Sequence, residues 1–368
     1  MKIRVPQRDI ADAVNKVKTV VSSKSALPIL THVLMETVGG TVKLSATDLK
    51  VGIECTVDCT VDEPGSLTVS CQRLASVLAE LPEADVEIAL GENGVVDLRC
   101  AKSEYQLFSM SPDEFPPIRT FEGIDAIVIP QMTLREILSK VSFAICTDQA
   151  RYNLTGLLVD IKDGKLTAVA TDGKRMSLYI ETEGIPDDVT VKVIVPGKMI
   201  AELERLLDNE GPVEIFIDEN QAAFVFGSIR MVSALIEGTF PNYEMVIPKK
   251  HDKEIVLNTQ RFAEAMRRTR TMTNEKFNTV RVKLGSGLIT LKVVTPEVGE
   301  YEEDVEVEYD GSALEVAFNP DFILDILRHV TTEKMILLLK DATNPGVLKP
   351  YTEAAVDRYV NVVMPIRA

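Results

Sequence analysis

The sequence has few of the residues on which metal binding and nucleophilic catalysis depend. Its 368 residues include three histidines, five cysteines and no tryptophan. The histidines, His32, His251 and His329, lie far apart, and no two cysteines form a C-x-x-C pair. A zinc site or a Cys–His nucleophile is therefore disfavoured, and we expect neither a metal nor a cofactor. The cysteines are expected to be buried as small apolar side chains: Cys55, Cys59, Cys71, Cys100 and Cys146.

Long apolar runs are also absent. No stretch approaches the roughly 18 consecutive apolar residues of a membrane-spanning helix, and the opening residues, MKIRVPQRD, lack the apolar segment of a signal peptide. We therefore expect a cytoplasmic protein with no membrane partner. The formal net charge of −16 opposes nonspecific attraction to nucleic acid, whose backbone is itself anionic.

The chain is long enough for two or three domains, and an internal repeat favours three. The segments LSATDLKVGIE, AVATDGKRMSLYIE and LKVVTPEVGEYEEDVEV each run through alternating apolar residues into a threonine. Thr47, Thr171 and Thr295 are separated by 124 residues in each case. Each copy also ends in a proline-containing segment: EFPPI, TFPNY or VVMPI. A spacing kept over several segments indicates a repeated structural unit.

Each copy contains two segments in which apolar residues recur every three or four positions, which predicts amphipathic helices. Between them lie alternating runs joined by Gly-Gly, Asp-Gly or Gly-Ser-Gly, which predict β-hairpins. The fold class is therefore α+β, with two helices packed on antiparallel strands in each repeat. The expected domains are 1–120, 127–247 and 253–368. The predicted helices are 9–21, 71–81, 133–145, 196–208, 259–272 and 319–330.

The segment VATDGKRMSL concentrates charge after a predicted strand. It could be a catalytic constellation, a phosphate loop or the rim of a docking site. Asp-Gly after a strand is also an ordinary turn, and the pattern G-x-x-x-x-G-K-[ST] is absent around Gly173. No second carboxylate and base recur in a convincing arrangement, so we expect no catalytic residues.

Several motifs in fixed order resemble the β sliding clamp family of bacterial replicative DNA polymerases. They are LPILTHVLME and ATDL in the first repeat, FAICTDQARYNLTG, ATDGKRM, VIVPGK and LIEGTFPNYEMVIP in the second, and NEKFNTVRV, VEYDG and YVNVVMPIRA in the third. The resemblance covers the whole chain. It implies three similar domains per chain, two chains joined head to tail, and a closed ring of six domains around duplex DNA, with no catalytic activity. It also implies a homodimer whose other partners are the polymerase catalytic subunit, the clamp loader and further proteins with a clamp-binding motif.

The resemblance implies a groove between the second and third domains that receives short peptides from these partners. Aliphatic and thioether side chains would accept a leucine or phenylalanine anchor, and arginines at the edge would meet peptide carbonyls or carboxylates. The sequence departs from the family pattern at Lys174, Met176 and Met245, so peptides are expected to rank differently. The apolar VVMP segment also fits a core strand, and both roles stay open. The implied groove residues are Arg151, Leu154, Thr171, Gly173, Lys174, Arg175, Met176, Pro241, Met245, Val246, Val362, Val363, Met364, Pro365, Ile366 and Arg367.

The resemblance also implies a dimer interface between the first domain of one chain and the third domain of the other. Cations and apolar residues would face carboxylates there. Glu104 and Thr271 depart from the family pattern, and the acidic run also fits a solvated strand edge. The implied interface residues are Arg73, Lys102, Tyr105 and Leu107 on one side, and Met272, Glu297, Glu300, Glu302 and Glu303 on the other.

Counted over 7–24, 71–81, 133–145, 196–208, 259–272 and 319–330, the helical segments carry a formal charge of +4 in a chain of −16, so the rest of the chain carries −20. Helices that line a central hole would present a mildly basic surface to DNA, although cations on solvated helix faces are also common. The candidate phosphate contacts are Lys24, Lys140, Lys198, Arg205 and Arg268.

Three classes of function are compatible with a triplicated α+β chain. A sliding clamp that gives a polymerase its processivity is the reading that the resemblance favours. An enzyme would need a convergent acid–base or metal site, and the sequence contains no such pattern. A peptide-binding scaffold that does not encircle DNA would keep the groove and lack ring closure.

Overall fold

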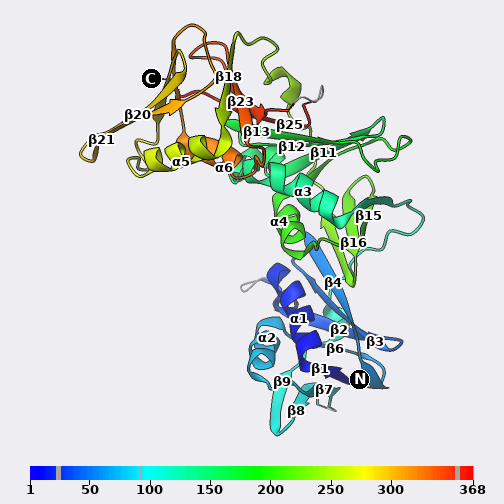
Figure 1. The fold of residues 1–368 in the computed structure, drawn as a ribbon. Coiled ribbons are helices and arrows are strands. Elements are labelled where there is room, and N and C mark those ends of the chain that lie inside the picture. The colour runs from blue at the N-terminus through cyan, green and yellow to red at the C-terminus, as the bar shows by residue number, and fades with distance from the viewer. Residues whose placement is uncertain (22–25, 92, 353–356, 368) are drawn as a thin grey trace. The chain divides into compact units, whose positions relative to one another are not determined.

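The computed structural model describes residues 1–21, 26–91, 93–352 and 357–367. The chain divides into two units, which we treat separately: Met1–Arg135 with Ala201–Leu235, and Glu136–Ile200 with Ile236–Ala368. Each unit contains antiparallel sheets and helices, which confirms the predicted α+β class (Figure 1). The expected domain boundaries of 1–120, 127–247 and 253–368 stay predictions.

A helix forms in each segment where the sequence predicts one. In the first of them, the buried residues Ile10, Ala13, Val14 and Val17 recur at three- and four-residue spacing, which places them on one face. The helices are α1 (Gln7–Val17), α2 (Cys71–Glu80), α3 (Gln131–Val141), α4 (Gly197–Leu206), α5 (Thr259–Arg270) and α6 (Pro320–Leu327). Short 3-10 turns are η1 (Lys18–Val20), η2 (Pro28–Thr31), η3 (Pro112–Glu114), η4 (Ser142–Ala144), η5 (Gln149–Leu154) and η6 (Tyr243–Met245).

The two helices of the last repeat begin at asparagine caps. The Asn258 side chain accepts a hydrogen bond from the Arg261 N–H at 3.0 Å, and the Asn319 side chain accepts one from the Asp321 N–H at 2.9 Å. Pro320 occupies the first turn of α6, where its missing N–H costs nothing. These caps fix where α5 and α6 start.

The first unit contains two sheets in which every described pairing is antiparallel. The smaller sheet has the order β5 (Thr60–Glu63), β1 (Lys2–Pro6), β7 (Asp85–Leu90), β8 (Val95–Cys100) and β9 (Ser103–Phe108). The larger has the order β10 (Ile127–Pro130), β15 (Pro212–Ile217), β16 (Gln221–Phe226), β17 (Ile229–Ala234), β4 (Val51–Asp58), β3 (Thr41–Thr47), β2 (His32–Val38) and β6 (Ser66–Ser70). The pairing of β17 with β4 therefore joins strands of the first and second repeats.

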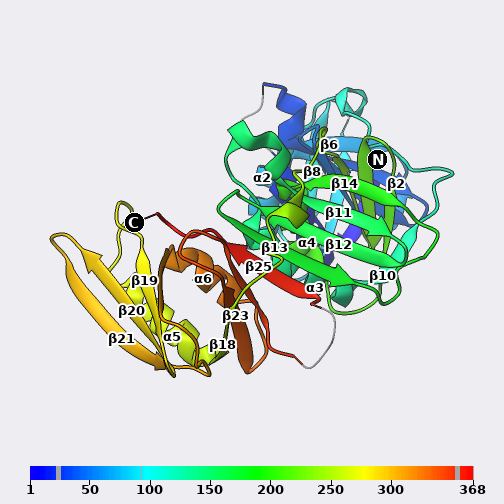
Figure 2. The same ribbon diagram turned by 90° about the horizontal axis from the view of Figure 1, so that it is seen from above.

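The second unit has the same organisation. Its larger sheet has the order β14 (Val191–Pro196), β11 (Gly156–Lys162), β12 (Lys165–Thr171), β13 (Arg175–Glu181), β25 (Tyr359–Val363), β24 (Gly346–Pro350), β23 (Lys334–Leu339) and β18 (Lys253–Asn258). Its smaller sheet has the order β21 (Gly299–Glu306), β20 (Leu288–Thr295), β19 (Val280–Gly285) and β22 (Leu314–Phe318). The pairing of β13 with β25 joins the second and third repeats, and Figure 2 shows these strands side by side.

The predicted hairpin turns are confirmed in all three repeats. The pairs that close them are Val38↔Thr41, Lys162↔Lys165 and Gly285↔Leu288, each around a two-residue turn. Each turn contains a glycine with a positive φ value, Gly39, Gly164 or Gly287, as tight hairpin turns require.

The start of β11 requires a residue without a side chain, because a Cβ atom at Gly156 would lie 2.5 Å from the Val195 carbonyl oxygen and 2.8 Å from the Ile236 side chain. We predict that Gly156→Ala lowers the free energy of unfolding by about 1–3 kcal/mol through this overpacking. The control is Gly285→Ala, where the nearest atom is 3.9 Å away. Denaturant unfolding of both variants measures the difference, and equal midpoints would contradict the predicted clash.

Candidate functional site

Strand pairing brings two distant candidate segments together in the second unit. Arg175 pairs with Val363 and Met176 with Val362 in the β13–β25 ladder. The ladder continues beyond β25, because the Met364 N–H donates to the Lys174 carbonyl at 2.8 Å. The groove wall, which we define as residues 171–176, therefore lies directly beside the C-terminal segment 362–367, as the implied groove requires.

The same region contains an apolar cluster that extends to the protein surface. Met176 and Val362 are both buried in this cluster together with Leu178, Phe240, Ile336 and Val347, and Leu154, Tyr243 and Ile247 pack against it. Tyr243 and Ile247 bracket Met245 and Val246, which are exposed; the exposed fraction of Met245 is 81%. Met364, directly after β25, is 39% exposed. Apolar side chains are thus accessible at the edge of a buried core, next to the groove wall.

Thr171 and Asp172 form the turn that closes the groove wall. The Thr171 hydroxyl donates to the Arg175 carbonyl at 2.6 Å, and Asp172 Oδ1 accepts from the Lys174 and Arg175 N–H groups at 2.8 and 3.0 Å. Gly173 has φ +80°. A carboxylate that accepts backbone N–H groups of its own turn has a structural role there.

The first repeat builds the same turn without the groove residues. The Thr47 hydroxyl donates to the Val51 carbonyl at 3.0 Å, and Asp48 Oδ1 accepts from the Lys50 and Val51 N–H groups at 2.9 and 2.7 Å. Leu49 has φ +74°, where the second repeat has glycine. The Thr-Asp pair therefore belongs to the shared fold, and residues 173–176 carry what is particular to the second repeat.

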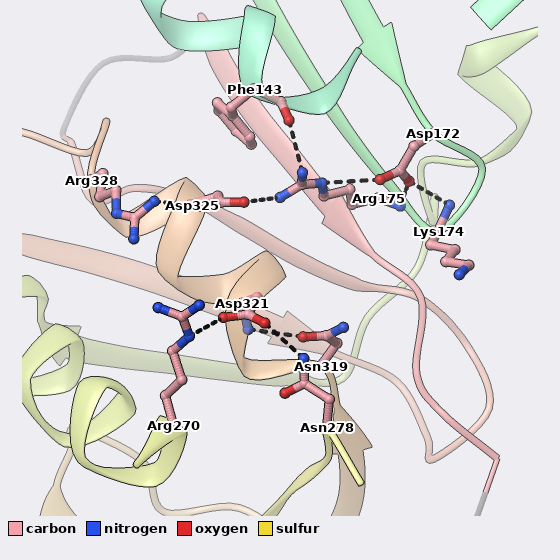
Figure 3. Close-up of polar contacts among 10 residues, drawn as sticks. All are labelled: Phe143, Asp172, Lys174, Arg175, Arg270, Asn278, Asn319, Asp321, Asp325 and Arg328. Atoms are coloured by element: carbon pink, nitrogen blue, oxygen red, sulfur yellow. Dashed lines mark hydrogen bonds and ion pairs between the residues drawn. The ribbon is translucent and has the colours of Figure 1, made fainter. Parts of the chain in front are cut away.

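The two arginines of the predicted groove differ in their availability. The Arg175 side chain is only 12% exposed, and its guanidinium pairs with Asp172 and Asp325 (Figure 3). The prediction that Arg175 meets peptide groups at the edge is therefore not supported by its position. Arg151 is 44% exposed; it donates to the Asp172 carbonyl at 2.6 Å and pairs with Asp148 at 3.4 Å. Hydrogen bonds from the Ala150 N–H and then from Arg151 lower the pKa of Asp148.

The remaining groove candidates lie at the surface or near it. Lys174 and Gly173 are exposed, and Figure 3 shows the Lys174 amine directed away from Asp172. Pro241 and Arg367 are exposed, whereas Val363 is fully buried. Pro365 and Ile366 are half-buried, and the Ile366 N–H donates to the Ala317 carbonyl at 2.8 Å. The C-terminal segment is therefore held by backbone bonds on both sides of Pro365. VVMP is both a core strand and a neighbour of the groove wall, so the two roles coexist.

Lys140, a candidate phosphate contact, is buried. Its amine donates to the His329 carbonyl and lies 5.2 Å from the centre of the Tyr359 ring. Burial lowers the pKa of Lys140, and burial followed by the charge of Lys140 lowers the pKa of His329. An amine in this position cannot reach a phosphate, so we withdraw Lys140 as a DNA contact. The sequence could not show this, because a lysine on an amphipathic helix is usually solvated.

Two of the other candidate cations, Arg205 and Arg268, have partners within their own units. Arg205 pairs with Glu202 at 2.9 Å and also donates to the Lys16 carbonyl. Arg268 makes a bidentate pair with Glu303, whose pKa is lowered by it. Lys198 is exposed on α4 and has an interaction with another residue. Lys24 lies outside the described residues.

Most of the candidate interface residues lie on or next to edge strands, and Arg73 lies on α2. Tyr105 and Leu107 share one face of β9, the edge of the smaller sheet in the first unit, and Arg73 and Lys102 are exposed. The glutamates lie on β21 or just before it, at the edge of the smaller sheet in the second unit. Three of the glutamates already have partners, because Lys292 pairs with Glu302 at 3.0 Å and with Glu300 at 3.9 Å, and Arg268 pairs with Glu303 at 2.6 Å.

Sequence reasoning missed several residues. Phe108, the last residue of β9, is 83% exposed, and alternation along the strand could have placed it on the outer face. Asp325 and Phe322 on α6 contact Arg175, and no sequence pattern singled them out.

A cavity of about 620 Å³ beside α6 is lined by Arg267, Arg270 and Arg328.

Two absences hold for the described part of the chain. Among residues 1–21, 26–91, 93–352 and 357–367, no group of three or more His, Cys, Asp or Glu side chains could hold a metal ion. Within the same ranges, no helix has the length and apolar character needed to span a membrane.

Comparison with known proteins gives matches along the whole chain. Family models of the DNA polymerase III beta subunit match residues 1–119 (N-terminal domain), 128–242 (central domain) and 244–367 (C-terminal domain). A beta sliding clamp of Pseudomonas putida is 34% identical over 370 residues, covering 100% of both chains. One of Chlamydia muridarum is 30% identical over 367 residues, covering 100% of this chain and 99% of the relative.

Similar solved structures come from the same family as these sequence relatives. The DNA polymerase III subunit beta from Pseudomonas aeruginosa superimposes with a TM-score of 0.93 at 33% identity, covering 100% of both chains. The DNA polymerase sliding clamp from Bacillus subtilis gives a TM-score of 0.96 at 27% identity, covering 100% of this chain and 99% of that one. The chain therefore belongs to the family of DNA polymerase III beta subunits, the beta sliding clamps.

Proposed function

We propose that this chain is a DNA sliding clamp, a non-catalytic processivity subunit of a DNA polymerase. Two copies join head to tail into a ring of six domains that encircles duplex DNA. Partner proteins, including the polymerase catalytic subunit and the clamp loader, bind through the groove beside β13 and β25. Membership of the beta sliding clamp family over the full chain supports the proposal.

The observation that carries the groove assignment is the junction of residues 174–176 with residues 362–364. The β13–β25 ladder places an exposed methionine, Met364, beside a wall whose polar groups are engaged in its own turn. Apolar surface next to fixed polar backbone suits a short peptide that inserts a leucine or phenylalanine anchor. Methionine at the edge, as at Met245 and Met364, adapts to anchors of different shape.

Ring closure would use the two sheet edges. The exposed cations Arg73 and Lys102, with the Tyr105–Leu107 face of β9, complement the acidic β21 edge in charge. Glu302 and Glu303 pair closely within the chain, whereas Glu300 lies 3.9 Å from Lys292 and keeps 67% of its side chain exposed. We therefore propose Glu297 and Glu300 as the carboxylates that meet the partner's cations, with Met272 as the apolar contact. Contacts between two different surfaces that close at two copies form a ring without free ends.

The weak positive charge of the helices suits a topological tether. A protein that neutralised many phosphates would bind with a steep dependence on salt, whereas a closed ring only has to avoid falling off. Lys24, Lys198, Arg205 and Arg268 stay as proposed phosphate contacts. For Arg205 and Arg268, contact with DNA would compete with Glu202 and Glu303.

Ring closure makes retention depend on DNA topology. We predict that the protein, once loaded by a clamp loader, dissociates from covalently closed circular DNA at least about tenfold more slowly than from the same DNA after linearisation, since a ring slides off free ends. The half-life of labelled protein on each DNA measures this. Equal half-lives would rule out encirclement and favour a scaffold that binds partners without enclosing DNA.

The groove assignment predicts that its exposed methionines bind peptide and do not stabilise the fold. We expect the double variant Met245→Ala/Met364→Ala to bind a peptide about tenfold more weakly, because it loses apolar contact at the edge. The probe is a fluorescein-labelled decapeptide that ends in Leu-Phe, read by anisotropy.

Met132→Ala provides the matched control, because Met132 is 60% exposed and lies in the first unit. It should bind the decapeptide like the wild type. If the double variant also binds normally, the groove is not where the peptide docks.

A further inference from the structure

Arg175 has more polar contacts than a residue at the edge of a binding groove needs. Its Nε lies 3.2 Å from Asp172 Oδ2, and its Nη1 lies 2.5 Å from Asp325 Oδ2. Its Nη2 donates to the Phe143 carbonyl at 2.8 Å. All three guanidinium nitrogens are therefore engaged within the protein (Figure 3).

Two aromatic rings shield this guanidinium from water. Its carbon lies 4.7 Å from the centre of the Phe322 ring and 5.4 Å from that of the Phe143 ring. Phe143 in turn stacks on His329, with ring centres 5.1 Å apart and an interplanar angle of 7°. Cation–π contacts strengthen when the cation is desolvated, so the rings and the carboxylates hold the same charge in place.

The contacts of Arg175 connect the groove wall to helix α6. Asp172 shapes the 171–175 turn through its other oxygen, whereas Asp325 and Phe322 belong to α6. Asp325 is held as well, because its Oδ1 accepts from Arg328 at 2.7 Å. We call this set of contacts among Asp172, Arg175, Phe322 and Asp325 the α6 clasp.

We propose that Asp325 and Phe322 are positioning residues for the peptide groove, which act through Arg175 and make no contact with the peptide. The proposal rests on the proposed function of the groove. Without Asp325, the Arg175 guanidinium would have Asp172 as its single carboxylate partner. A buried charge that loses one of its partners destabilises the folded arrangement around it. The side chain would turn toward solvent, which would release the 171–175 turn and the Lys174–Met364 backbone bond that shapes the groove.

The same helix provides a matched control in Asp321, which lies one turn before Asp325. Asp321 pairs with Arg270 at 2.6 Å and accepts from the Asn278 amide at 2.7 Å. Figure 3 shows this second set of contacts at the start of α6, separate from Arg175. Its carboxylate is also about as accessible, 33% against 24% for Asp325. Loss of either carboxylate removes one ion-paired acid from α6, but only Asp325 belongs to the α6 clasp.

The test measures affinity for the Leu-Phe decapeptide in the full-length variants Asp325→Asn, Asp321→Asn, Arg175→Ala and Arg175→Ala/Asp325→Asn. We expect Asp325→Asn to weaken binding about tenfold and Asp321→Asn to leave it within about twofold. The double variant should bind the peptide no more weakly than Arg175→Ala alone. If Asp325 acts through Arg175, the effects of the two substitutions on affinity are not additive. Thermal melting of all four variants shows whether they are folded.

Phe322→Leu serves as a second variant, because it removes the ring from the guanidinium and keeps an apolar side chain. It should weaken binding about threefold, in keeping with a single cation–π contact. This variant decides the question if Asp325→Asn does not fold.

Three results would overturn the clasp. The first is wild-type affinity for the peptide in both Asp325→Asn and Phe322→Leu. The second is an equal loss of affinity in Asp321→Asn and Asp325→Asn, which would indicate that either substitution destabilises α6 as a whole. The third is additive loss in the double variant, which would mean that Arg175 and Asp325 act separately. In each case the groove itself would stand. If neither the wild type nor Met132→Ala binds the decapeptide, the groove assignment fails, and the clasp fails with it.

Discussion

The proposed peptide groove depends on the antiparallel pairing of β13 with β25. This ladder aligns Met176 with Val362 and Arg175 with Val363, although the strands belong to different repeats. Side chains alternate between the faces of a sheet, so a one-residue slip would move each β25 side chain to the opposite face, and all five of these residues are buried. The apolar cluster around Met176 and Val362 resists such a slip, so the core fixes the geometry of the proposed groove.

Comparison of the repeats shows which residues of the groove wall are shared with the first repeat and which occur only in the second. Thr47–Asp48 and Thr171–Asp172 close the same turn with the same hydrogen bonds, so this pair is part of the fold. Gly173 to Met176 replace Leu-Lys-Val-Gly of the first repeat, and Arg175 thereby gains Asp325 on α6. A shared turn has been adapted by a few side chains, and the proposed groove follows from those side chains.

Much of this architecture could be predicted from the sequence, because the signals are local. Apolar periodicity located α1 to α6, and the two-residue turns located the hairpins. Long-range environment could not be predicted in the same way. Lys140 was expected at the surface, yet the packing of His329 and Tyr359 encloses it, and Arg175 was expected at the edge, yet it lies between Asp172 and Asp325. A charged residue reveals its partner only when the fold brings distant segments together.

The central claim is that two copies of this chain form a ring that can enclose duplex DNA. Electron microscopy of the purified protein tests it most directly. The account predicts two-fold symmetric particles of two chains, with six domains around a central opening wide enough for a DNA duplex. Particles of a single chain, or dimers without such an opening, would contradict it.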